Sequence, residues 1–137
     1  MPMIDDEQLL WQFENCTLPK TLWTHSAHVR VAYLYLRREH VDEVINRMRA
    51  GIKALNATHG TLDTPTGGYH ETMTQAWLRV IASLLTKSGP AVSSEAFIQE
   101  HALLRQSRML QQFYSHELLM SAKARAQFVE PDLAPLP

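Results

Sequence analysis

The segment THSAHVRVAYLYL, residues 24–36, decides the predicted fold class of this 137-residue chain. Thr24 is a typical helix N-cap, because its hydroxyl can accept a hydrogen bond from a free N–H of the first turn. With a period of 3.6 residues, one helix face then carries His25, His28, Val29, Ala32, Tyr35 and Leu36. A similar helical spacing of apolar residues recurs in the stretches that follow. The chain contains no Asn-Gly or Asp-Gly turn and no sustained alternation of apolar and polar residues, which are the signals of strands and hairpins. The sequence therefore predicts an all-α fold, a single compact helical bundle of five to six helices.

Proline and glycine residues divide the chain into the predicted helical segments. Helices are expected at residues 5–15, 24–40, 42–58, 70–87, 94–106 and 107–129, the last with a break at Ser115 or Ser121. Asp5 and Thr24 are the expected N-caps, and Gly60 lies where a helix C-terminus is expected. Residues 130–137, EPDLAPLP, form an extended Pro-rich tail. We expect residues 1–137 to form one helical domain.

The charge balance disfavours several classes of partner. Lys and Arg number 13 against 14 Asp and Glu, a net charge of −1, which disfavours nucleic-acid binding. The basic residues Arg47, Arg49 and Lys53 fall mainly on the outer surface of the 42–58 helix, which is typical of a solvated face. The N-terminus is acidic and lacks an apolar signal segment, and the apolar runs are too short to span a bilayer. We expect a cytoplasmic protein without nucleic-acid or membrane partners.

The seven histidines are the unusual feature of the composition. Short connections favour antiparallel neighbouring helices. The 24–40 helix should therefore begin at the end of the bundle where the 42–58 helix finishes and the 70–87 helix starts. On this topology, five polar residues meet on inward faces at one end: His25, His28, His59, His70 and Glu71. His101 is expected to point toward the same end.

Such a cluster predicts a metal- or ligand-binding site. His25 and His28, at i and i+3, present two imidazoles on one face, and His70, with His59 as a further candidate, would complete a zinc or iron site. Glu71 and Tyr69 are candidate catalytic residues, an acid or proton acceptor and a hydroxyl group. The alternative is that these residues have a purely structural role. Histidines near helix ends can serve as hydrogen-bonded polar residues, and Glu71 is a good first-turn acid.

Three blocks of sequence together resemble a family of small uncharacterised bacterial proteins. The blocks are THSAHVRVAYLYL at 24–36, YHETMTQAW at 69–77 and FVEPDLAPLP at 128–137. The family has a similar H-x-x-H segment, then a Y-H-E-T segment, then a tail containing Pro-Asp. The resemblance implies a bacterial cytoplasmic protein with one intact domain. It carries no established activity.

Two functions of different classes follow from the sequence. The favoured hypothesis is a metal- or small-molecule-binding protein, catalytic or not, with its pocket at the histidine-rich end of the bundle. Its cofactor, if the site holds one, is expected to be zinc or iron. The alternative is a non-catalytic protein-interaction module or homodimer that uses the helical surface. A pocket with convergent polar groups would favour the first, and a large exposed apolar patch would favour the second.

Overall fold

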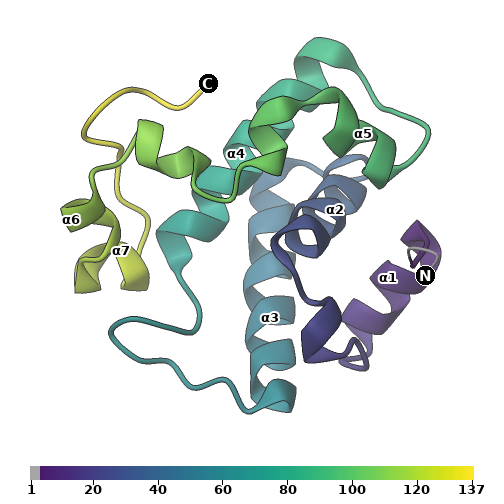
Figure 1. Ribbon diagram of the computed structural model, residues 1–137, viewed down its shortest axis with the longest axis horizontal. Helices are drawn as coiled ribbons and strands as arrows, with labels where there is room; N and C mark the ends of the chain where they lie inside the picture. The colour runs from purple at the N-terminus through teal and green to yellow at the C-terminus, as the bar shows by residue number, and fades with distance from the viewer. Residues whose placement is uncertain (1–3) are drawn as a thin grey trace.

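A computed structural model describes residues 4–137, and it is built from helices packed around α2 (Figure 1). The elements in chain order are α1 (Asp6–Glu14), the 3₁₀-helix η1 (Lys20–Leu22), α2 (His25–Leu36), α3 (Val41–His59), α4 (Glu71–Ser88), α5 (Ser94–Glu100), η2 (Ala102–Arg105), η3 (Met109–Gln112), α6 (His116–Leu119) and α7 (Ala122–Ala126). The buried side chains form one core cluster, so the predicted compact all-helical fold is confirmed. Helices α1 and α6–α7 lie on opposite sides of the molecule (Figure 1).

Helix α2 is the central element of the core. It contacts α1, α3, α4 and α5, and eight of its twelve residues are buried. A helix that is covered on all sides must be apolar around most of its circumference, as α2 is from Val29 to Tyr35 apart from Arg30. Tyr33 is fully buried and stacks on Phe97 of α5, with ring centroids 4.4 Å apart. The segment that predicted the fold class is therefore the one that organises the core.

Arg30 lies buried in this core, with only 4% of its surface exposed. Its Nε donates to Ser94 Oγ at 2.7 Å, and its Nη2 donates to the Ile4 carbonyl at 2.7 Å and to Asp6 at 3.1 Å. Helices α1 and α5 both pack on this side of α2, so no face of α2 is left to solvent. A buried guanidinium requires such partners for its donors.

Helices α3 and α4 are capped by unexpected residues. The His40 and His70 side chains are the N-caps, each accepting a backbone N–H through Nδ1. At its C-terminus, α3 ends at Gly60 as predicted, because Gly60 adopts the left-handed conformation (φ 71°). The end of α3 and the starts of α2 and α4 lie at one end of the fold, as the antiparallel topology requires.

The C-terminal third departs most from the predicted helices. The described residues form seven α-helices, so the predicted count of five to six is wrong. The 94–106 segment divides into α5 and η2, and the 107–129 segment divides into η3, α6 and α7. Ser115 and Ser121 are both N-caps, and each accepts a hydrogen bond from the N–H three residues ahead. The helical structure is therefore interrupted at both serines.

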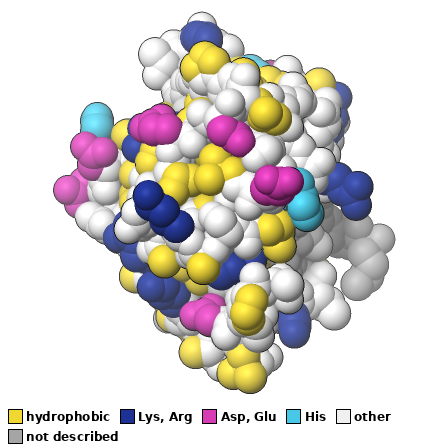
Figure 2. All heavy atoms as spheres, turned by 90° about the vertical axis from the view of Figure 1, so that its left-hand side faces the viewer, with side chains coloured by type: hydrophobic (Ala, Val, Ile, Leu, Met, Phe, Trp, Pro, Cys, Tyr) yellow, Lys and Arg dark blue, Asp and Glu magenta, His cyan; other side chains and the backbone are white. Residues whose placement is uncertain are grey.

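The surface carries no single-sign charge field on the face that includes α6 and α7. Acidic and basic side chains lie interspersed among hydrophobic ones there (Figure 2). Across residues 4–137, every helix is too short or too polar to cross a membrane.

Gly51 marks the closest approach between α3 and α1, and it supports a first prediction. A Cβ at Gly51 would overlap the ring of Phe13, which is 1% exposed and held in the core. The variant Gly51→Ala should therefore lose about 2 kcal/mol of unfolding free energy in urea titration, despite a helix-propensity gain of about 1 kcal/mol. Phe13→Leu in the same chain should relieve part of the overlap and give a non-additive loss. A more stable Gly51→Ala protein would contradict this account.

Candidate functional site

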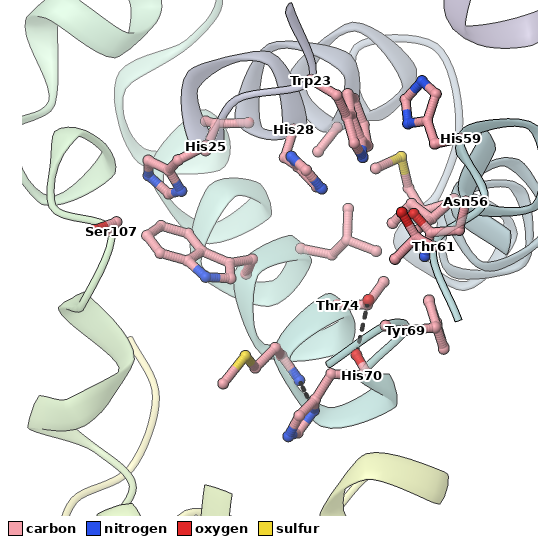
Figure 3. Close-up of a pocket in the computed structure, with 18 of the residues that line it drawn as sticks. Trp23, His25, His28, Asn56, His59, Thr61, Tyr69, His70, Thr74 and Ser107 are labelled. Atoms are coloured by element: carbon pink, nitrogen blue, oxygen red, sulfur yellow. Dashed lines mark hydrogen bonds between the residues drawn. The ribbon is translucent and has the colours of Figure 1, made fainter. Parts of the chain in front are cut away.

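A cavity of about 500 Å³ opens between η1, α2, α3 and the first half of α4 (Figure 3). This volume lies within the range of about 300–1,000 Å³ that is typical of small-molecule sites. The walls are mainly apolar and aromatic: Trp23, Val29, Ala32, Met48, Ile52, Met73, Trp77, Leu78 and Ile81. The polar lining residues include His25, His28, Asn56, His59, Thr61, Tyr69, His70 and Thr74. All four histidines predicted to meet at this end, together with Tyr69, therefore line one pocket.

His28 is the polar group that projects from α2 into the cavity (Figure 3). Its ring stacks on Trp23, with ring centroids 3.6 Å apart. Its Nδ1–H donates to the Thr24 carbonyl at 2.8 Å, which fixes the tautomer and leaves Nε2 as an acceptor. Burial, with a smaller contribution from the nearby His25, lowers the pKa of His28 to about 4. The ring is therefore neutral near pH 7.

His25 and His59 are held in the same way by backbone carbonyls. His25 Nε2–H donates to the Leu104 carbonyl at 2.9 Å, and the ring lies against Trp77 with centroids 4.8 Å apart. His59 Nε2–H donates to the Leu18 carbonyl at 2.8 Å. Each anchored ring keeps Nδ1 as its second nitrogen.

His70 lies apart from the other three histidines. Its ring is turned away from them, at the opposite side of the view in Figure 3. Both ring nitrogens have partners: Nε2–H donates to the Leu119 carbonyl at 2.7 Å, and Nδ1 accepts from Met73 N–H at 3.1 Å. Burial lowers the pKa of His70 below its ordinary value. His70 therefore fastens the start of α4 to the C-terminal segment.

These contacts bear on the predicted metal centre of His25, His28 and His70. Among residues 4–137, no three His, Cys, Asp or Glu side chains are grouped so that they could hold a metal ion. His70 uses both ring nitrogens in backbone hydrogen bonds, whereas His25 and His28 each use one and keep the second. His101, also expected at this end, instead contacts Ser88 at the far end of α4, with Nε2 3.1 Å from Oγ.

Glu71 and Tyr69, the candidate catalytic pair, belong to a network beside the pocket. Glu71 is buried, and its carboxylate accepts from Arg49 Nε at 2.8 Å, Arg49 Nη2 at 2.7 Å and Gln75 Nε2 at 2.6 Å. Tyr69 O–H donates to the same carboxylate at 2.9 Å. The Arg49 hydrogen bonds hold the pKa of Glu71 down at about 2, and burial raises the pKa of Tyr69 to about 12. All carboxylate oxygens therefore have donors, and Tyr69 stays protonated.

Sequence reasoning missed two residues that shape the site. Arg49 was assigned to the outer surface of its helix, but it reaches across to Glu71 on α4. Nothing in the sequence pairs these residues, because their contact depends on how α3 packs against α4. The second residue is Trp23, which lines the pocket and stacks on His28. Its position directly before the Thr24 N-cap was the available signal, since a large apolar residue there packs back on its own helix.

Comparison of the chain with known protein families, curated proteins and solved structures finds no match. Function must therefore be inferred from the geometry and chemistry of the pocket itself.

Proposed function

We propose that this protein binds a small, largely apolar organic molecule in the pocket formed by η1, α2, α3 and α4. The observation that carries the proposal is an apolar cavity of about 500 Å³ into which a neutral histidine, His28, presents an acceptor nitrogen. Small-molecule sites typically combine apolar walls with a few oriented polar groups. Within residues 4–137, no protein donor is hydrogen-bonded to His28 Nε2.

The protonation states favour binding over acid–base catalysis. An effective catalytic acid or base has a pKa near the working pH. The pKa of His28 is about 4 and that of Glu71 about 2, so both are weak bases at pH 7, and the pKa of Tyr69 is about 12. Glu71 is further occupied by Arg49 and Gln75. These groups suit the recognition and positioning of a ligand.

The proposal predicts that an apolar probe binds at the pocket and that filling the pocket prevents it. The probe 2-methylnaphthalene should shift the indole N–H resonances of Trp23 and Trp77, which line the cavity, in a nitrogen–proton NMR titration. Trp11 is 59% exposed and lies outside the lining, so its indole resonance is an internal reference. Ala32→Met places extra side-chain volume against the cavity and should weaken binding about tenfold.

The matched control is Ala54→Met, which makes the same change at an exposed position of α3 outside the pocket. This variant should bind the probe as the wild type does. Equal shifts at all three tryptophans, or binding that survives Ala32→Met unchanged, would contradict a pocket-specific function.

A further inference from the structure

The anchored histidines give the pocket a defined hydrogen-bonding character. The ring nitrogens of His25, His28 and His59 that face backbone carbonyls must carry hydrogen, because a carbonyl oxygen can only accept. The ring of His28 is neutral near pH 7, so its second nitrogen is an acceptor without a hydrogen. The Tyr69 hydroxyl donates to Glu71 and the Thr74 hydroxyl to the His70 carbonyl, so neither offers its hydrogen to a ligand.

We infer that the ligand is an uncharged aromatic molecule carrying a hydroxyl or ring N–H group that donates a hydrogen bond to His28 Nε2. This inference rests on the proposed function and adds the ligand's chemical class to it. His28 is the group best placed for the role, since it projects into the cavity from α2 and its Nδ1–H is committed to Thr24 (Figure 3).

The charges around the pocket favour an uncharged ligand. Among the described residues, none of those lining the cavity is Asp or Glu, and Lys20 on η1 is the lining residue with a permanent charge. A cationic ligand would therefore lose hydration without gaining a carboxylate partner. A carboxylate ligand would face the acceptor nitrogen of His28, because that ring is neutral at pH 7. An uncharged donor group avoids both costs.

The shape and composition of the walls favour a flat aromatic ligand. Trp23 stacks between Phe13 and His28, with centroid distances of 5.2 and 3.6 Å, so this wall is a column of aromatic rings. Trp77 contributes a further indole ring. Met48 and Met73 line the same cavity, and thioether sulfur makes favourable contacts with aromatic rings. Aromatic rings gain about 0.5–1.5 kcal/mol from such pairing beyond the burial of their area.

The test is a cycle of two ligands and two proteins. The ligands are 2-naphthol and 2-methylnaphthalene, which have nearly the same shape but differ in a donor hydroxyl and a methyl group. The proteins are the wild type and His28→Phe, which keeps an aromatic ring against Trp23 but has no acceptor. Dissociation constants are measured by NMR from the Trp23 and Trp77 indole resonances at pH 7.5. Comparing the ratio of the two constants between the two proteins cancels the general difference in hydrophobicity of the ligands.

We expect the preference for 2-naphthol over 2-methylnaphthalene to fall about tenfold from the wild type to His28→Phe, the effect of one lost hydrogen bond. An unchanged ratio, with both ligands still bound, would overturn the donor inference and leave the proposed function standing. If neither ligand moves the Trp23 and Trp77 resonances, both the inference and the proposed function fail.

A measurement on the wild-type protein avoids dependence on the variant's folding. Nitrogen-15 NMR of the imidazoles should show His28 as the Nδ1–H tautomer, and His25 and His59 as Nε2–H tautomers. Adding 2-naphthol should shift the His28 Nε2 resonance toward lower frequency, as a new hydrogen bond to this nitrogen requires, while 2-methylnaphthalene should not. A shift of equal size with both ligands would overturn the inference.

Discussion

Replacing Arg49 with methionine should lower the free energy of unfolding by about 3 kcal/mol at pH 7, because it leaves a charged carboxylate without its partner in the core. The Glu71 side chain is 8% exposed, and Arg49 donates to both of its oxygens. Tyr69 and Gln75 would remain as donors, but neither supplies a positive charge. Urea denaturation of the wild type and the variant measures the loss.

The chain offers a matched control for this variant. Arg47, on the same helix, pairs with Glu39, but the Arg47 side chain is 51% exposed. Arg47→Met should therefore cost much less stability than Arg49→Met, because exposed pairs contribute little. Adding Glu71→Gln to Arg49→Met removes the unpaired charge and should recover part of the loss. Similar losses for Arg49→Met and Arg47→Met would refute the assignment of a buried pair.

Acidification from pH 6.5 to pH 4.5 should destabilise the protein through His28. The pKa of His28 is lowered to about 4 in the folded state, against 6.5 without the fold, so the unfolded chain binds the extra proton first. Stability therefore falls as the pH falls through this window, by about 2 kcal/mol for this one group. The pKa of His70 is also lowered, and it adds to the loss with the same sign.

The carboxylates lose their contribution to stability at lower pH, below the pH range in which His28 loses its own. Glu71, with a pKa lowered from 4.5 to about 2, stabilises the fold above pH 4.5, and that stability is lost as the pH falls toward 2. Chemical denaturation at several pH values would compare the wild type with His28→Phe, which should lose about 2 kcal/mol less between pH 6.5 and 4.5. His116→Phe makes the same substitution at an exposed position on α6 and is the matched control. Parallel curves for wild type and His28→Phe would exclude His28 as the source.

Local sequence signals were sufficient to predict those helix ends whose capping depends only on neighbouring residues. Asp5 and Thr24 cap helices as predicted, because an N-cap needs only its own side chain and the next few N–H groups. Gly60 ends α3 for an equally local reason. The same principle explains why Ser115 and Ser121, both suspected as breaks, interrupt the C-terminal region.

The hydrogen-bond partners of the histidines depend on long-range packing, which the sequence pattern does not reveal. Helical periodicity placed His25, His28 and His59 at one end of the fold, and they do line one cavity there. Periodicity gives the face of a helix, but it does not give the partner of a ring nitrogen. The carbonyls that hold His25 and His70 belong to Leu104 and Leu119, 79 and 49 residues away. Those contacts depend on long-range packing, which the helical period does not encode.

The hydrogen bonds between the C-terminal segment and the region at the start of α4 also limit the order in which the structure can form during synthesis. Three contacts bind the start of α4 to residues 49, 55 and 58 positions away: His70 with Leu119, Thr72 with Gln127, and Arg125 with the Gly67 carbonyl. During synthesis the N-terminal part of the chain emerges from the ribosome before the C-terminal part. Helices α1 to α3 can therefore dock while the α4 side of the cavity is still unsecured. The α4 side of the cavity can therefore be secured only after residues 119–127 have been synthesised.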